Sequence, residues 1–259
     1  MYETTEKRKS AILEELAGAR SVQVSDLSRR LGVSEVSIRH DLEDLETRGL
    51  LRRVRGGAVS VPQTMQDWSF NEKMLMRREQ KERIGRAAAA MVNAGDVIIM
   101  DSGTTVVHMA RSLSPELLTS GDVTVITGSI PIVRELGPWK GVHLISLGGV
   151  YLPQQEVVVG PQSVANLAEL HADKMFLGAD GLSLEVGATT RTVLDAEVDR
   201  ASAKASDQVI GLIDSTKIGR RGLATVVPLS EIDVLITDDA APADFVAKAR
   251  DLGLEVRVV

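Results

Sequence analysis

The chain has 259 residues, of which 44% are hydrophobic, so it can form one large or two ordinary domains with a substantial core. It has no cysteine and four scattered histidines. This excludes disulfide and thiolate chemistry and disfavours a zinc site, so we expect neither a metal nor a cofactor. No apolar run approaches the ~20 residues of a membrane span, and the charged N-terminus does not resemble a signal peptide. We therefore expect a cytoplasmic protein without a membrane partner.

The formal net charge of -6 is unevenly distributed along the chain. Residues 1–60 carry eleven Lys or Arg against ten Asp or Glu, a balance of +1, and the remaining residues carry nineteen against twenty-six, a balance of -7. Positive charge is concentrated at Arg48, Arg52, Arg53 and Arg55, which follow one another without an intervening acid. Binding to a polyanion would depend on this local patch rather than on the overall charge.

The first fifty residues predict three helices. Residues 6–17 form an amphipathic helix, and residues 25–31 form a second, short one that ends at a Gly-containing turn. Ser34 is a suitable N-cap for the third helix, since its hydroxyl can accept a hydrogen bond from a free amide of the first turn. Apolar residues then recur at i, i+4 and i+7 as Ile38, Leu42 and Leu45. The third helix therefore buries one face.

The opposite face of the third helix is predicted to be exposed, with Val36 and His40 at its centre and Ser37 and Arg39 at its margins. Residues 50–59 then read as two strands joined by a basic Gly-Gly turn. Alone, each feature is typical of a solvated helix or a plain turn, but in this order they favour a winged helix-turn-helix that binds double-stranded DNA. The residues expected at the DNA are Ser34, Val36, Ser37, Arg39, His40, Arg52, Arg53, Arg55, Gly56 and Gly57.

The segment from Val24 to Ala58, VSDLSRRLGVSEVSIRHDLEDLETRGLLRRVRGGA, resembles the N-terminal helix-turn-helix of the DeoR family of bacterial repressors. That family usually shows V-S-x-x-T-I-R-R-D-L-x-x-L-x-x-x-G-x-L-x-R-x-H-G-G-A. Here Ser37 replaces Thr, His40 replaces the second Arg of the recognition helix, and Arg55 replaces the His of the wing. Because His40 lacks the permanent charge and the paired donors of Arg, we expect a different operator sequence rather than a loss of DNA binding.

A linker and a connecting helix are predicted between the two ends of the chain. Residues 59–68 read as a polar linker, and residues 70–91 as one long helix that either packs on the next domain or forms a dimer. We therefore expect a DNA-binding domain at 1–60, a linker and connecting helix at 61–92, and an effector-sensing and oligomerisation domain at 93–259.

The predicted sensing domain alternates apolar runs with helical stretches. Runs of this kind, bounded by turn residues and rich in β-branched side chains, indicate an α/β fold with a mostly parallel sheet and helices on both faces. Ligands of such sheets bind outside the carboxyl ends of the strands. The runs are VIIMD, VTVITG, VHLISLGG, KMFLGADG, QVIGLID, DVLITD and LEVRVV.

Small and polar residues at five of these strand ends are candidate effector contacts. A Gly/Ser/Thr loop that opens a helix offers amides and hydroxyls to a phosphate, although such loops also serve as plain caps. Lysine can act as a point charge for a phosphate, or lie in solvent. The candidates are Asp101, Ser102, Gly103, Thr104, Thr105, Thr127, Gly148, Gly149, Asp180, Gly181 and Lys217.

This half of the chain also resembles the DeoR family, whose sensor shows D-S-G-T-T, V-I-T-N-S, L-G-G, F-L-G-A-D-G and D-S-S-K in this order and is similar to ribose-5-phosphate isomerase. The resemblance implies that residues 102–105 hold a phosphate and that Asp180 and Lys217 reach the sugar. Gly128 stands where the family usually has Asn. Asp195 and Asp199 stand where Glu and Lys are common.

The resemblance implies a repressor of sugar genes that acts as a dimer or tetramer and responds to a phosphorylated sugar. Two alternatives remain open. One is a sugar-phosphate isomerase with a DNA-binding appendage, in which Asp180 would be the base. The other is a DNA-binding protein whose larger domain serves only for oligomerisation.

Overall fold

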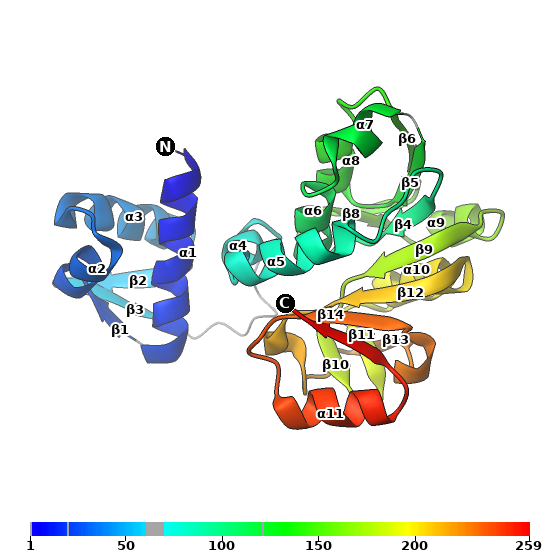
Figure 1. Cartoon of the computed structure of the whole chain (residues 1–259). Coiled ribbons are helices and arrows are strands. Elements are labelled where there is room, and N and C mark those ends of the chain that lie inside the picture. Colours follow the sequence, from blue (N-terminus) through cyan, green and yellow to red (C-terminus); the bar gives the residue numbers. More distant parts are fainter. Residues whose placement is uncertain (1, 20, 61–69, 121) are drawn as a thin grey trace. The chain divides into compact units, whose positions relative to one another are not determined.

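The structure is a computed structural model that describes residues 2–19, 21–60, 70–120 and 122–259 (Figure 1). The chain divides into two compact units, residues 1–78 and residues 79–259. In the described ranges, no helix combines the length and the apolar character needed to cross a membrane.

The N-terminal unit contains helices and a small antiparallel sheet in the strand order β1-β3-β2. Its core consists of aliphatic side chains and Met76, and the largest of them, including Ile12, Leu27 and Ile38, are fully buried. The predicted helices and hairpin are confirmed, whereas strand β1 was not predicted. The elements are α1 (Tyr2–Ala19), β1 (Ser21–Gln23), α2 (Val24–Leu31), α3 (Glu35–Thr47), β2 (Leu51–Val54), β3 (Gly57–Ser60) and α4 (Phe70–Leu75).

Helix α3 is fixed at its start and on its buried side. Ser34 caps it as predicted, since its hydroxyl oxygen accepts a hydrogen bond from the Ser37 amide at 3.2 Å. Gly32, with φ 65°, ends α2 in the left-handed conformation that glycine adopts readily. One further contact was not predicted: Asp41 of α3 is buried and accepts two hydrogen bonds from Arg8 of α1.

The prediction of one long helix over residues 70–91 is wrong. Two helices, α4 and α5 (Arg78–Ala89), replace it. The chain changes direction at Arg77, whose φ of 54° is incompatible with a right-handed helix. The Arg77 amide donates to the Glu14 carboxylate of α1 at 3.1 Å, which helps to hold the break. The predicted linker over residues 59–68 lies mostly outside the described residues.

The C-terminal unit is built on a seven-stranded sheet in the order β15-β14-β12-β9-β4-β5-β6, in which every neighbouring pair is parallel. All seven strands coincide with the apolar runs predicted from the sequence. All four residues of β14 are buried, as expected where both faces of the sheet are covered. The strands are β4 (Val97–Met100), β5 (Val123–Thr127), β6 (Val142–Ser146), β9 (Ala172–Leu177), β12 (Ser206–Leu212), β14 (Val234–Thr237) and β15 (Glu255–Val258).

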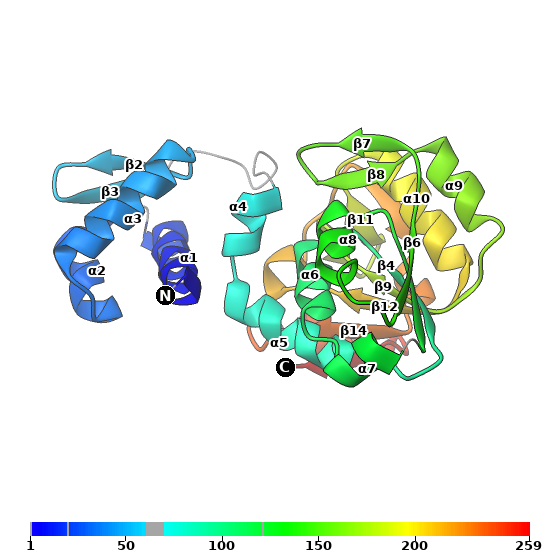
Figure 2. The same cartoon turned by 90° about the horizontal axis from the view of Figure 1, so that it is seen from above.

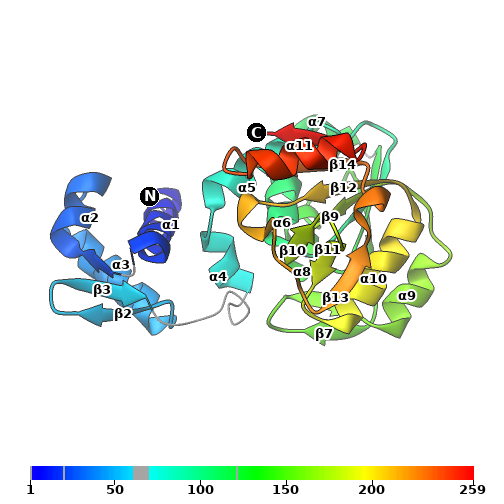
Figure 3. The same ribbon diagram turned by 90° about the horizontal axis from the view of Figure 1, so that it is seen from below.

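Helices flank this sheet, with α6 and α8 on one side and α9 and α10 on the other (Figures 2 and 3). Two further helices, α7 and α11, and two 3-10 turns, η1 and η2, complete the unit. The bounds of all these elements are α6 (Thr104–Ala110), α7 (Pro115–Ser120), α8 (Ile130–Leu136), α9 (Pro161–Leu167), α10 (Val193–Lys204), α11 (Ala243–Asp251), η1 (Ser215–Lys217) and η2 (Leu229–Glu231).

Two smaller antiparallel sheets of the C-terminal unit were not predicted. One is the hairpin β7–β8, and the other has the order β10-β11-β13. Their strands have only three or four residues, too short for a clear periodic signal. They are β7 (Val150–Leu152), β8 (Val157–Val159), β10 (Gly181–Ser183), β11 (Gly187–Thr190) and β13 (Ala224–Val227).

Candidate DNA-binding and effector-binding sites

The outward face of α3 carries the side chains predicted for DNA recognition. Val36, Arg39 and His40 are exposed, and Ser37 is half-buried. Val36 is 72% exposed, a high value for an aliphatic residue in the first turn of a helix. In a helix-turn-helix, the N-terminal residues of the second helix contact base edges, and an exposed valine there offers a surface for a thymine methyl group.

The wing presents the arginines of the basic patch. Arg52, Arg53 and Arg55 are exposed on β2 and the turn. The two glycines differ in role, because only Gly56 has a positive φ, 84°, and forms the turn. Gly57 already belongs to β3, and a Cβ atom there would lie 2.0 Å from the Val22 carbonyl oxygen of β1. Gly57 is therefore needed for close strand packing rather than for turning the chain.

Carboxylates of α3 lie beside arginines of α3, of its C-terminal end and of the wing. Arg39 pairs with Glu35 at 2.6 Å, and the Arg53 guanidinium lies 3.8 Å from Glu43. Arg48 lies 3.5 Å from Asp44. The basic patch of residues 48–55 contains no acid in the sequence, but in the folded protein carboxylates of α3 partly neutralise it. The Arg39 and Arg53 pairs are exposed and weak, so DNA phosphates can replace their carboxylates at small cost, whereas the Arg48–Asp44 pair is half-buried.

In the C-terminal unit, the loops after β4 and β9 meet at two glycines. A Cβ atom added to Gly178 would lie 3.2 Å from the Cα atom of Gly103. Asp101 joins the same loops, because one of its carboxylate oxygens accepts a hydrogen bond from the Ser102 amide at 2.5 Å and the other from the Gly178 amide at 2.9 Å. The Asp101 side chain thus holds the loop that was predicted to bind phosphate.

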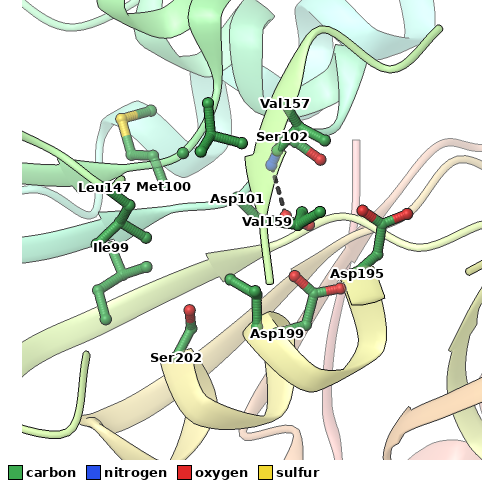
Figure 4. A pocket seen from close by; sticks show the side chains of 13 residues that line it. Ile99, Met100, Asp101, Ser102, Leu147, Val157, Val159, Asp195, Asp199 and Ser202 are labelled. Carbon is green, nitrogen blue, oxygen red and sulfur yellow. Dashed lines mark hydrogen bonds between the residues drawn. The ribbon is translucent and has the colours of Figure 1, made fainter. Parts of the chain in front are cut away.

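A small cavity of about 20 Å³ lies beneath this loop (Figure 4). Asp101, Ser102 and Gly128 line it together with Asp195 and Asp199 of α10. This volume admits about one water molecule, so a sugar phosphate would need the surrounding loops to open or would bind at their outer surface. No group of three or more His, Asp or Glu side chains in the described ranges is placed to hold a metal ion.

Two aspartates at the cavity, Asp101 and Asp199, have raised pKa values. Burial raises the pKa of Asp101 to about 6, although hydrogen bonds from the Ser102 and Gly178 amides oppose this effect. The pKa of Asp199 is raised well above its ordinary value by burial and by the charges of Asp101 and Asp195. Asp199 also hydrogen-bonds Asp101, which lowers the pKa of Asp101 and raises that of Asp199. Of the two carboxyl groups, that of Asp199 is therefore the one more readily protonated.

The remaining predicted effector residues do not line this cavity. Thr105, Thr127 and Gly181 are buried, and the Thr127 hydroxyl donates to the Met100 carbonyl at 2.7 Å. Thr104 is half-buried at the start of α6, and Gly148 and Gly149 are exposed.

Asp180 and Lys217 already interact with groups of the protein. Asp180 accepts hydrogen bonds from Arg191 at 3.2 Å and from Thr190 at 3.3 Å. The charge of Lys217 helps to lower the pKa of Asp214. Sequence reasoning missed Arg191, because no motif marked it.

Steric crowding explains why position 128 is a glycine. A Cβ atom on Gly128 would lie 2.6 Å from the Val158 carbonyl oxygen of β8. The Gly128 carbonyl also accepts a hydrogen bond from the Val158 amide at 2.8 Å. The β7–β8 hairpin thus fills the space where a longer side chain would project, so an asparagine would require the hairpin to move.

A winged helix-turn-helix joined to an α/β domain with polar loops at its strand ends has the organisation of a ligand-responsive transcriptional regulator. Two family models match the chain, the DeoR-like helix-turn-helix domain over residues 8–64 and the DeoR C terminal sensor domain over residues 76–239. The chain belongs to the DeoR family of transcriptional regulators, and its homologues are transcriptional regulators rather than enzymes.

Relatives match over nearly the whole length. The chain is 33% identical to a putative aga operon transcriptional repressor of Escherichia coli O157:H7, covering 98% of this chain and 94% of that protein. It is 35% identical to the HTH-type transcriptional repressor GlcR of Bacillus subtilis, covering 92% and 89%. It is 31% identical to the HTH-type transcriptional regulator GolR of Listeria innocua, covering 97% and 98%.

Among solved structures, the C-terminal unit shows a weak likeness to ribose 5-phosphate isomerases. The enzyme of Neisseria gonorrhoeae matches with a TM-score of 0.39 and 16% identity, over 54% of this chain and 53% of that one. The enzyme of Methanocaldococcus jannaschii matches with a TM-score of 0.40 and 17% identity, over 54% of each chain.

Proposed function

We propose that the protein is a cytoplasmic repressor that binds an operator through α3 and the wing and is controlled by a phosphorylated sugar in its C-terminal unit. The observation that carries the first part is the exposed face of α3, with Val36, Arg39 and His40 beside the arginine-bearing wing. Two of its relatives are named as transcriptional repressors, and the name of one of them refers to an operon. These names support negative control of metabolic genes.

The DNA-bound form is proposed to be a dimer or tetramer. One winged module places a single short helix in the major groove, which gives too few base contacts for specific binding. Two modules on one operator multiply the affinity through their high effective concentration. The balance of only +1 in residues 1–60 adds to this argument, since one module gains little from charge attraction alone.

The effector is proposed to place its phosphate on residues 102–105, with Asp180 and Lys217 near the sugar. The adjacency of the loops after β4 and β9 supports this proposal. For the effector to regulate, it must bind the DNA-competent and DNA-incompetent arrangements with different affinities. The raised pKa of Asp199 favours this proposal, because a neutral Asp199 leaves one negative charge fewer to repel a phosphate near the cavity that Asp101 and Asp195 also line.

The proposal is tested by melting the purified protein with a panel of sugar phosphates and the corresponding free sugars. A ligand of the native state raises the melting temperature by mass action, and we expect only phosphorylated sugars to do so. Thr104→Ala should reduce that shift and leave DNA binding intact. Stabilisation by a free sugar alone would contradict the phosphate site. No response to any compound, together with DNA binding that ignores sugar phosphates, would favour a C-terminal unit that serves only for oligomerisation.

A further inference from the structure

The β10–β11 hairpin brings Arg191, which no sequence motif marked, to the predicted effector site. Gly181 of β10 pairs with Thr189 of β11, so the residues that flank the hairpin, Asp180 and Arg191, return to the same end of it. The Asp180 amide donates to the Thr189 carbonyl at 2.9 Å and closes this end. The side chains of Asp180 and Arg191, eleven positions apart in the sequence, are therefore held together.

Asp180 and Arg191 form an ion pair that is largely withdrawn from solvent. The Arg191 Nε atom donates to a carboxylate oxygen of Asp180 at 3.2 Å, and the side chains of Arg191 and Asp180 are 16% and 23% exposed. The Thr190 hydroxyl donates to the same oxygen at 3.3 Å. Little water screens the attraction between the two charges, and both groups still reach the surface, where a ligand can contact them.

The loop that carries Asp180 also meets the predicted phosphate loop. Gly178, two residues before Asp180, donates its amide to the Asp101 carboxylate at 2.9 Å. Gly178 also lies directly against the backbone of the loop of residues 102–105. Arg191 is thus one ion pair away from the segment that is proposed to hold the phosphate.

The charges around this position mean that a bound phosphate needs a cation. Three aspartates line the cavity beneath the loop (Figure 4), and Asp180 lies in the neighbouring loop. Among the effector residues predicted from the sequence, Lys217 is the only basic one. An anion placed among carboxylates is repelled unless a cation compensates for them. The guanidinium of Arg191 suits this task better than an ammonium group, because its planar donors can bind two phosphate oxygens at once.

We propose that Arg191 binds the phosphate group of the effector and gives up its pairing with Asp180 to do so. The incoming phosphate replaces the carboxylate as the partner of the guanidinium. The released Asp180 then accepts hydrogen bonds from the sugar hydroxyls. Asp180 is therefore a competitor of the phosphate before binding and a ligand of the sugar in the complex. This inference rests on the proposed effector site and identifies the cation of that site.

The competition predicts opposite effects for two variants. Inorganic phosphate is titrated into the full-length protein by calorimetry at constant ionic strength. Arg191→Gln should weaken phosphate binding about tenfold or more, because a charged hydrogen-bond donor is lost. Asp180→Asn should strengthen phosphate binding, by up to about fivefold, because it removes the competing carboxylate. Arg111→Gln is the matched control and should bind as the wild type does, since Arg111 pairs with Glu135 at 2.9 Å at the other end of α6.

The outcomes separate the role of Arg191 from the proposed phosphate site. Equal phosphate binding by Arg191→Gln and wild type would overturn the inference, and so would weaker binding by both Arg191→Gln and Asp180→Asn, since Arg191 would then only position Asp180. If the wild type does not bind phosphate, the proposed phosphate site fails and the role of Arg191 fails with it. If Arg191→Gln weakens binding and Thr104→Ala does not, Arg191 keeps its role and the placement of the phosphate on residues 102–105 is wrong.

The folding of each variant is checked by far-ultraviolet circular dichroism. Should Arg191→Gln fold poorly, Asp180→Asn decides by itself. Tighter phosphate binding by Asp180→Asn supports the competition for Arg191, and unchanged or weaker binding overturns it.

Discussion

At the scale of single residues, the aspartates of α10 show what a sequence can and cannot reveal. The sequence alone shows that Asp199 stands where the family commonly has Lys. It does not show that Asp199 is buried beside Asp101, because the two residues are distant in the chain and meet only through packing of α10 on the sheet. In the fold, burial and the neighbouring carboxylates raise the pKa of Asp199.

This pair makes stability depend on pH. Because the carboxyl pKa values are raised, the folded state binds protons more tightly than the unfolded state. The contribution of the pair to the free energy of unfolding is therefore fully present below roughly pH 4, the pKa of an aspartate in the unfolded chain. That contribution is lost as pH rises through about 6, the pKa of Asp101, and further as Asp199 titrates.

Asp199→Asn keeps a neutral hydrogen-bond donor at the same place and removes the charge. We expect its melting temperature to fall less than that of the wild type between pH 4 and pH 8, by a difference on the order of 5 °C. Melting followed by circular dichroism across this range would measure it. Asp251→Asn, at an exposed position, is the control. Parallel pH profiles of wild type and Asp199→Asn would show that the pair does not titrate as described.

At the scale of elements, long buried strands were predictable and short pairings were not. Each of the seven parallel strands is an apolar run, because burial on both faces imposes one. Strand β1 depends on a distant partner, β3, and hairpin β7–β8 pairs two strands of only three residues each, too short for a periodic signal. The same applies to the helix break at Arg77, which a contact with α1 helps to hold. The candidate site was predictable as loops at strand ends, but its carboxylate cluster was not.

The contact between β1 and β3 yields a prediction for the wing. Gly57→Ala would place a methyl group against the Val22 carbonyl oxygen, so the strands must separate. We expect a loss of several kcal/mol from the N-terminal unit, in the range of severe overpacking, and weak DNA binding. Thermal unfolding and a gel-shift assay would measure the two effects. Gly56→Asn should be milder, because asparagine tolerates the left-handed conformation of the turn. Equal stability of Gly57→Ala and wild type would contradict the packing of β1 described above.

At the scale of the whole molecule, a nearly neutral DNA-binding region is combined with an acidic remainder of charge -7. DNA attraction must then come from a few exposed arginines rather than from a general field. Arg55→Ala should weaken binding to all DNA sequences and lower the slope of log affinity against log salt by about one. Arg257→Ala, in the C-terminal unit, should leave the slope unchanged. A slope that is equal in Arg55→Ala and wild type would place the wing away from the phosphates.

The aliphatic core of the N-terminal unit also has a spectroscopic consequence. Between residues 21 and 60 the chain has no Phe, Tyr or Trp, and its two tryptophans are Trp68 and Trp139. If Trp68 is replaced by Phe, the remaining tryptophan emission comes from Trp139 of the C-terminal unit, whereas far-ultraviolet circular dichroism records the helices of both units. If the two units of this Trp68→Phe variant melt at different temperatures, the two signals will separate, and a ligand that shifts the emission transition alone will have stabilised the C-terminal unit and not the module that binds DNA.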